Sequence, residues 1–294
     1  MRHKAATLRI QTGGFTLIEL LVVIAVITVL MGALLPALHL ARQRAQAVVC
    51  RTHLSQWGTI LSFYLVDNEG RFPRTSGLCP GLPLLRGIYI GHNIDPNAPG
   101  RPHPIRTEKV ACCPLATKTT GVGAFGSLYR GNLFMKVNHG GTFFAWENTI
   151  PAPCFRMSYG LNAALVRTLP PFEGFAAAPR LPGPPREYTD VWSLEGTDNI
   201  PLLLDSAEVN CTMWMDTWAP PAEEPVGTGG GLCINRHRGT LNGLLLDWSV
   251  RPLGLKELWT LKWDGEFNTS GPWTRAGGVN PEDWPKWMRG FKDY

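Results

Sequence analysis

The sequence predicts an α+β protein in which one long amino-terminal helix precedes a head with a mainly antiparallel β-sheet and long loops. Residues 15–41 are almost entirely apolar, and a helical period continues beyond them to about residue 66. From Phe72 onward the chain holds nearly all of its 25 prolines, which disfavours further long helices. We therefore expect three parts, residues 1–14, residues 15–70 and residues 71–294.

The apolar segment has about 27 residues, enough to span roughly 30 Å of hydrocarbon as a helix. Pro36 lies inside it and removes one backbone hydrogen bond, which membrane helices tolerate. The segment has a single carboxylate, Glu19, and an ionised carboxylate inside a membrane costs roughly 2.5 to 3.5 kcal/mol. Such a residue is by default functional and is expected to have a charged partner.

The residues before the apolar segment differ from those of an ordinary secretory signal. Residues 1–14 carry three positive charges and no acid, which favours a cytoplasmic location for this end. The small pair Gly13-Gly14 precedes the apolar segment, whereas a secretory signal places its small-residue cleavage site after it. Cleavage at Gly14 would remove the basic leader and keep the apolar helix.

The basic leader, the Gly14-Phe15 junction and the following Thr16-Leu17-Ile18-Glu19 resemble the amino terminus of type IV prepilins and type II secretion pseudopilins. The resemblance implies a pilin-like fold, cleavage after Gly14 by a prepilin peptidase, and N-methylation of Phe15 as the new terminus. Glu19 would pair with the terminal amine of a neighbouring subunit, because two opposite charges in hydrocarbon are stabilised by meeting. The alternative is a plain signal anchor that tolerates one glutamate.

An amphipathic stripe continues the helix beyond the membrane-length segment. Its members, at steps typical of a helix, are Ala41, Ala45, Val48, Val49, Thr52, Gln56, Thr59, Ile60 and Phe63. We expect this face to pack on the head. Gly70 suits a left-handed cap and Pro73 follows it, so the helix is expected to end just before Gly70.

Four segments of the head have the apolar composition of strands. They are residues 85–90, 142–146, 200–204 and 243–250. Long loops such as residues 170–188 must join them. The head of about 225 residues is large enough for one sizeable core, and the sequence contains no internal repeat.

Four further pieces resemble a large subgroup of pilin-like proteins from bacteria that encode many of them. In chain order they are Cys50-Arg51-Thr52-His53-Leu54 with Gly70-Arg71-Phe72-Pro73, then Cys113-Pro114, then Ser158-Tyr159-Gly160-Leu161-Asn162, and last His237 followed by nine residues and Asp247. His53 replaces the subgroup's usual Asn. Trp248 replaces the Gly of the last motif, which disfavours a turn with positive φ after Asp247. The resemblance supplies no activity for this subgroup.

His237 and Asp247 would meet if a loop at residues 239–243 brought them together, and a histidine with a carboxylate can bind a metal or transfer protons. The alternative is that the pair fixes a hairpin through a buried hydrogen bond. Asp205, at the end of a candidate strand, is a candidate third member. A full metal site would need another ligand that the sequence does not identify, so we expect no metal and no cofactor.

Seven cysteines follow the membrane-length segment, in a compartment where disulfides persist. Their odd number leaves at least one unpaired. No Cys-x-x-Cys pair supports zinc, so structural disulfides are expected in preference to a metal site. Five of the 11 tryptophans lie after residue 258, where core packing is the expectation and a carbohydrate- or peptide-binding surface the alternative.

We expect a structural protein and not an enzyme, because the sequence has no Gly-x-Ser-x-Gly, no His-Glu-x-x-His and no P-loop. The net charge of +5 includes the three positive charges of the leader, and the mature chain at about +2 gives no warrant for nucleic-acid binding.

The function that the resemblance implies is a major or minor pilin or pseudopilin of a type IV pilus-like or type II secretion filament. Its partners would be the prepilin peptidase/methyltransferase, other pilin-like subunits and the inner membrane. It would cross that membrane once, with its head outside the cytoplasm, or stand in an extracellular or periplasmic filament. The alternative is a membrane-anchored extracytoplasmic binding or enzymatic protein that uses the prepilin-type export signal without polymerising.

Overall fold

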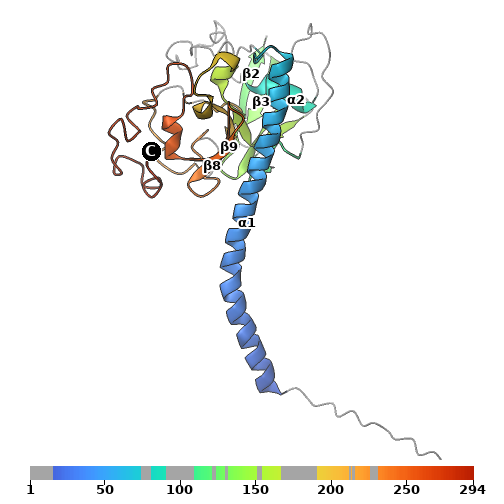
Figure 1. The fold of residues 1–294 in the computed structure, drawn as a ribbon. Coiled ribbons are helices and arrows are strands. Elements are labelled where there is room, and N and C mark those ends of the chain that lie inside the picture. The colour runs from blue at the N-terminus through green and yellow to red at the C-terminus, as the bar shows by residue number, and fades with distance from the viewer. Residues whose placement is uncertain are drawn as a thin grey trace, which may run out of the picture. The chain divides into compact units, whose positions relative to one another are not determined.

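The structure is a computed structural model, and it describes residues 16–73, 81–90, 109–120, 124–129, 132–150, 154–166, 191–211, 213, 216–225 and 231–294. Gly14, Phe15 and the loop expected at residues 170–188 lie outside these residues. The described part of the chain holds a long amino-terminal helix, a short second helix and two sheets whose strand pairs are mostly antiparallel (Figure 1). The predicted α+β fold with a long amino-terminal helix is confirmed.

Helix α1 (Leu17–Asp67) is continuous over 51 residues and runs through Pro36. The chain forms two compact units, one ending at Ala45 and the other beginning at Gln46. In the first unit the large apolar side chains of α1 are exposed. By length and composition α1 could cross a membrane, and no other helix in the described ranges could. In the second unit α1 contributes side chains to the core of the head.

The end of α1 follows the sequence-based prediction. Gly70 has a φ of 76°, and its backbone N–H donates to the carbonyl of Leu65 at 2.8 Å. This is the left-handed conformation that glycine adopts without strain. A Cβ at Gly70 would also collide with the indole of Trp192, so both conformation and space select glycine here.

The face of α1 that packs on the head is not the predicted stripe. The buried residues of α1 are Cys50, Leu54, Trp57, Gly58, Leu61 and Leu65. They follow the helical period, but Val48, Val49 and Phe63 of the predicted stripe are 52%, 43% and 66% exposed. The predicted helical period is confirmed, but the predicted buried face is wrong. Both faces of this helix carry apolar residues, and only the contact with the head distinguishes the buried face from the exposed one.

The first sheet has the strand order β1-β4-β3-β2, and β5 also pairs with β4. Its strands are β1 (Lys118–Thr119), β2 (Ala124–Tyr129), β3 (Asn132–Asn138), β4 (Phe144–Ile150) and β5 (Phe155–Met157). The β1–β4 pair is parallel and the other pairs are antiparallel. The strand predicted at residues 142–146 therefore exists, but it begins two residues later and is longer.

The strand predicted at residues 85–90 is wrong, because these residues are the end of helix α2 (Gly81–Ile90). Its apolar run is too short for its period to separate a strand from a buried helix. Pro83 lies in the first turn, where a missing backbone N–H is tolerated. Leu82, Leu84 and Leu85 then join the core that contains α1.

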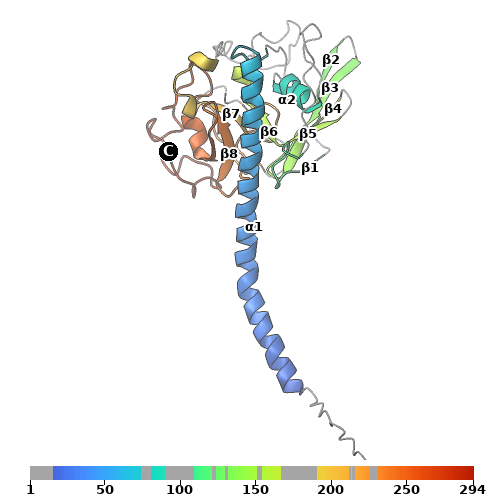
Figure 2. The same ribbon diagram turned by 45° about the vertical axis from the view of Figure 1, so that its right-hand side comes forward.

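The second sheet is antiparallel throughout, in the order β6-β7-β8-β9. Its strands are β6 (Tyr159–Leu161), β7 (Pro201–Asp205), β8 (Thr240–Leu245) and β9 (Val250–Gly254). From Gln46 onward α1 passes beside this sheet (Figure 2), with Gly58 against Leu244 of β8. Leu204 of β7 belongs to a second core, built with the carboxy-terminal residues. Every residue of β7 is accordingly buried, and the strand predicted at residues 200–204 is confirmed.

Residues 243–250 do not form the single strand that was predicted, because the chain reverses between β8 and β9. The Trp248 N–H donates to the Leu245 carbonyl at 3.0 Å, and the Asp247 carboxylate accepts from the Ser249 N–H at 2.9 Å. Trp248 has a φ of 70°, so the positive-φ turn that its side chain disfavours is present. Its indole packs against the core near Gly58, which offsets the backbone strain.

Four 3-10 helices complete the described elements. They are η1 (Ala163–Leu165), η2 (Val191–Ser193), η3 (Thr197–Asn199) and η4 (Lys256–Thr260). The residues after β9 bury Trp259, Trp263 and Trp284, with Trp273 and Trp287 packed partly exposed beside them. Core packing is therefore confirmed for the three buried rings.

Candidate functional site

Glu19 folds back onto the first residue before α1. The backbone N–H and Oγ1 of Thr16 donate to Glu19 Oε2 at 2.8 and 2.7 Å, and the Glu19 N–H donates to Thr16 Oγ1 at 3.3 Å. This reciprocal capping box satisfies backbone donors that a helix start leaves free. The Thr-x-x-Glu spacing in the sequence could have predicted this capping box. Gly14 and Phe15 lie outside the described residues, so their roles and that of Glu19 in assembly stay predictions.

The second candidate site is a buried polar cluster around Asp205, the last residue of β7. Its Oδ1 accepts from Arg236 Nη1 at 2.7 Å, and its Oδ2 accepts from the Asn242 N–H at 2.8 Å. His237 Nε2 lies 3.2 Å from Oδ2. Burial opposes ionisation of the carboxyl, but the Arg236 charge and these hydrogen bonds outweigh it and lower the pKa of Asp205 to about 2.

Arg236 holds this carboxylate from a fully enclosed position. Its five N–H groups donate to Asp205 and to the carbonyls of Thr142, Ser158, Gly141 and Ser206. The guanidinium therefore has a partner for every donor, which a buried charge requires. The four carbonyls lie beside strands of both sheets, so Arg236 fixes the position of the first sheet relative to the second.

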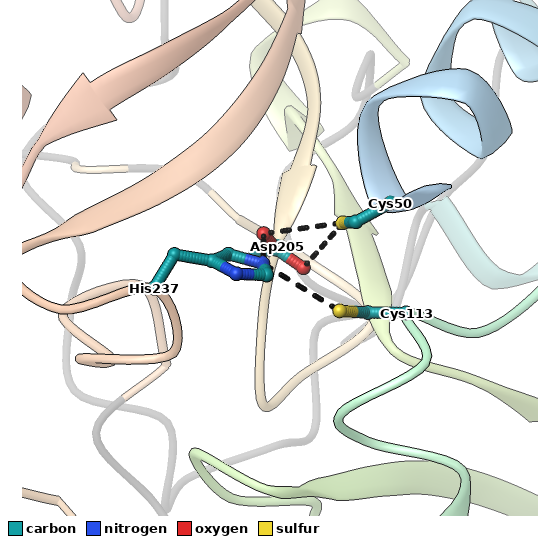
Figure 3. A group of neighbouring side chains, drawn as sticks. All are labelled: Cys50, Cys113, Asp205 and His237. Carbon is teal, nitrogen blue, oxygen red and sulfur yellow. Dashed lines mark hydrogen bonds and ion pairs between the residues drawn. The ribbon is translucent and has the colours of Figure 1, made fainter. Parts of the chain in front are cut away.

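Two thiols approach the same carboxylate and imidazole (Figure 3). Cys50 Sγ, from α1, lies 3.5 and 3.6 Å from the two oxygens of Asp205. Cys113 Sγ lies 3.5 Å from His237 Nε2. The Sγ atoms of Cys50 and Cys113, a carboxylate oxygen of Asp205 and a ring nitrogen of His237 all lie within 4.8 Å of one another. No residue pattern predicted that the two cysteines would lie with His237.

The surroundings of the cluster set its charge. Burial raises the pKa of the Cys50 thiol well above its ordinary value, and the neighbouring Cys113 and Asp205 raise it further. Burial alone would lower the pKa of His237, but hydrogen bonding to Asp205 and Cys50 raises it to about 9. These shifts favour the neutral thiol of Cys50 and the protonated imidazole of His237.

Local contacts explain how Cys113 reaches α1. One turn after Cys50, His53 Nδ1 lies 3.0 Å from the Cys112 carbonyl, and Trp57 Nε1 donates to the Val110 carbonyl at 2.9 Å. These contacts hold the segment before β1 along the helix. His53 therefore has a defined positioning role at the place where the resembling subgroup has Asn.

Asp247 does not join His237. His237 precedes β8 and Asp247 follows it, and a six-residue strand is about 20 Å long, so the two residues lie at opposite ends of β8. Asp247 is exposed, and its carboxylate caps the Ser249 N–H in the β8–β9 turn. The hypothesis that the pair shares a site is therefore wrong, whereas the suggestion that Asp205 lies with His237 is confirmed.

One residue from each motif piece lies in this cluster or in contact with it. Cys50, Cys113 and His237 are members, and the Tyr159 hydroxyl donates to Cys50 Sγ at 3.5 Å. Asn162, at the end of the Tyr-Gly-x-Asn piece, donates to the carbonyls of Pro201 and Trp263 at 3.0 and 2.9 Å.

The role of Arg236 was not predicted from the sequence. Most of its partners are backbone carbonyls from distant segments, which leave no residue pattern.

The expected disulfides are not confirmed. The six cysteines within the described ranges are free thiols, namely Cys50, Cys112, Cys113, Cys154, Cys211 and Cys233. Cys79, the seventh, lies outside the described residues.

Comparison with known proteins finds a family match at the amino terminus. The prokaryotic N-terminal methylation motif matches residues 11–35. The chain is 46% identical over 56 residues to the type IV wide pilus major component PilA4 of Thermus thermophilus, a segment that makes up 19% of this chain and 43% of that protein. No solved structure matches the chain. The amino terminus is therefore of the prepilin type, as its residues predicted.

Proposed function

From this prepilin-type amino terminus, we propose that the chain is a structural subunit, a major or minor pilin or pseudopilin, of a type IV pilus-like or type II secretion filament. Residues 1–14 are a leader that prepilin peptidase removes, residues 15–70 form the helix that anchors the subunit, and residues 71–294 form most of the head. The observation that carries the proposal is the methylation motif at residues 11–35, which contains Gly14, Phe15 and Glu19.

The structure of α1 supports assembly with other subunits. Residues 17–38 expose their large apolar side chains, which require lipid or neighbouring helices around them. In the second unit, Val48, Val49, Phe63 and Val66 form apolar positions of α1 that the head leaves between 43% and 66% exposed. A neighbouring pilin-like subunit would cover both stretches with the same kind of helix.

The contacts of Glu19 are compatible with pairing to a neighbour. The hydrogen bonds within the capping box use Oε2 and leave Oε1 for a second interaction. The new amine on Phe15 of an adjacent subunit is the charge that would compensate the carboxylate in hydrocarbon. The mature chain would then cross the inner membrane once before assembly, with its head outside the cytoplasm.

A matched pair of substitutions separates pairing from capping. Glu19→Ala removes both the carboxylate and the capping box, whereas Thr16→Ala removes only the hydroxyl of the capping box and keeps the carboxylate. We expect both variants to be cut after Gly14, as read by the mass of the amino-terminal peptide. Glu19→Ala should be at least tenfold depleted from the sheared filament fraction, and Thr16→Ala should be retained. Equal loss of the two variants would contradict the pairing role.

The size of the head favours one alternative, a membrane-anchored binding protein or enzyme that never polymerises. The aligned segment is 19% of this chain but 43% of the Thermus relative, so this chain is more than twice as long. The carboxy-terminal region also has a groove of about 750 Å³ lined by Trp273, Trp284, Trp287, Lys286 and Arg289, among others. If the wild-type chain is cut and membrane-bound but is never found in a filament, this alternative replaces the proposal.

A further inference from the structure

Four side chains with metal-binding atoms meet at the junction between α1 and the second sheet. Cys50 comes from α1, Cys113 from the segment before β1, Asp205 from the end of β7, and His237 from the turn before β8. The side chain of His237 is 4% exposed and that of Asp205 is fully buried, and both cysteines are buried as whole residues. The four ligand atoms lie within 4.8 Å of one another (Figure 3).

We propose that Cys50, Cys113, Asp205 and His237 bind a zinc ion that fastens α1 to the head. Two thiolates, one imidazole and one carboxylate form a donor set that suits Zn²⁺, and a closed set of four protein ligands is typical of a structural zinc site. This assignment goes beyond the expectation of no metal. It does not depend on whether the chain joins a filament.

Three of the six distances between the ligand atoms fit tetrahedral coordination, and all six are within 4.8 Å. With Zn–N and Zn–O bonds of about 2.0 to 2.1 Å and Zn–S bonds of about 2.3 Å, neighbouring ligand atoms lie about 3.3 to 3.8 Å apart. His237 Nε2 lies 3.2 Å from Asp205 Oδ2 and 3.5 Å from Cys113 Sγ. Cys50 Sγ lies 3.6 Å from the same Oδ2. Small shifts of these side chains would therefore admit the ion.

A hydrogen-bond network explains this geometry less well. His237 Nε2 faces both Asp205 Oδ2 and Cys113 Sγ, but one ring nitrogen carries a single N–H or a single lone pair. It cannot make a well-aligned bond to each. A metal ion held by the lone pair of Nε2 satisfies the nitrogen, the oxygen and both sulfurs at once.

The charge of the cluster also favours zinc. Arg236 neutralises Asp205 through Oδ1, which leaves Oδ2 directed at the cysteines and His237. When Zn²⁺ enters, both thiols and the protonated imidazole each lose one proton, so two positive charges enter the buried site and three leave it with the released protons. With a neutral imidazole the cluster then has no net charge, which avoids the desolvation cost of an uncompensated ion.

Contacts around the four ligands hold them in place. The Tyr159 hydroxyl donates to Cys50 Sγ at 3.5 Å, and the Cys113 N–H donates to Ser158 Oγ at 2.6 Å. The Asn242 N–H donates to Asp205 Oδ2 at 2.8 Å. Such outer contacts orient metal ligands and are expected at a structural site.

The test uses the full chain, purified in detergent without chelators. We expect close to one zinc per chain by elemental mass spectrometry, and a zinc X-ray absorption spectrum with two sulfur and two nitrogen or oxygen neighbours. Cys50→Ser and His237→Gln should each lower the zinc content at least tenfold after dialysis. The control Cys233→Ser, which replaces a buried thiol outside the cluster, should retain zinc.

A second measurement covers variants that fail to fold. Wild-type chain stripped with a chelator is titrated with zinc, and alkylation of Cys50 and Cys113 is followed by peptide mass spectrometry. We expect one equivalent of zinc to protect both thiols. Unprotected thiols with no zinc bound would overturn the proposal in favour of a hydrogen-bond network. A Cys50–Cys113 disulfide in the purified chain would also overturn it, because both sulfurs would be used.

Discussion

Arg236 and Asp205 form an ion pair with no exposed surface on either side chain, with Nη1 2.7 Å from Oδ1. The other donors of Arg236 bind carbonyls that flank β4 of the first sheet and β6 and β7 of the second. One side chain thus links the two sheets and orients the carboxylate that faces Cys50 and His237.

Replacing Arg236 with Met should therefore be strongly destabilising. The substitution leaves the Asp205 carboxylate and four carbonyls without their donor, and an unpaired buried charge typically costs about 3 to 5 kcal/mol. Urea unfolding of the detergent-solubilised chain measures this loss. The neighbouring exposed Arg238→Met is the matched control, with a change of about 0.5 kcal/mol or less. Comparable losses for both variants would show that Arg236 has no special role.

Local signals in the sequence predicted α1 and β7 well. The helix has a continuous period and a glycine at its left-handed cap, and the apolar run at residues 201–204 ends at a polar residue. These signals involve only neighbouring residues. The packed face of α1 could not be predicted in the same way, because Val48 and Phe63 are as apolar as the residues that the head covers.

The cluster was predicted only in part, because contacts between distant segments of the chain decide which of its side chains meet. Asp205 and His237 were recognised as chemically suited to each other, and their separation of 3.2 Å confirms that they meet. For the seven cysteines as a set, structural disulfides were expected in preference to a metal site, and no pairing was assigned to Cys50 or Cys113. Only the packing of α1 against the end of β7 brings a thiol to a carboxylate 155 positions away.

The glycine of the Tyr-Gly-x-Asn piece should not tolerate a side chain. A Cβ at Gly160 would lie 2.6 Å from the Glu208 carbonyl oxygen and 2.9 Å from Cys211 Cβ, both closer than a Cβ atom approaches in folded proteins. We expect Gly160→Ala to lower the free energy of unfolding by about 1 to 3 kcal/mol, as overpacking does.

The control for that variant is Gly290→Ala, whose Cβ would meet nothing within 4 Å. It should change the stability by no more than about 0.5 kcal/mol. Both variants are compared by thermal and urea unfolding. A Gly160→Ala variant as stable as Gly290→Ala would mean that the β6 strand can move away from residues 208–211.

The ammonium of Lys256 offers a test of the carboxy-terminal packing. This residue is 1% exposed, its Nζ donates to Asp293 Oδ1 at 2.7 Å, and it lies 4.9 Å from the centre of the Trp284 ring. Asp293→Asn removes the opposite charge and should cost about 1 kcal/mol, below the roughly 1.5 to 3 kcal/mol typical of hydrogen bonds to charged groups, because Asp293 is partly exposed. Limited proteolysis should then release the last residues faster. Glu282→Gln, an exposed change of the same charge, should leave the cleavage rate unaltered.

Substitutions in the β8–β9 turn can separate the free-energy cost of backbone strain from the contribution of side-chain packing. Trp248 has a φ of 70°, a conformation that costs a residue with a Cβ about 1 kcal/mol and costs glycine nothing. Trp248→Gly and Trp248→Ala both lose the indole contacts with the core, so both should be less stable than the wild type. Because only alanine retains the strain, the glycine variant should be the more stable of the two by about 1 kcal/mol.

The control is the neighbouring exposed Ser249, whose φ is not positive. There the order should reverse, with the alanine variant at least as stable as the glycine variant. Urea unfolding of the four variants gives both differences. The same order at both positions would mean that the turn relaxes when Trp248 is removed, and that the indole itself holds residue 248 in the left-handed conformation.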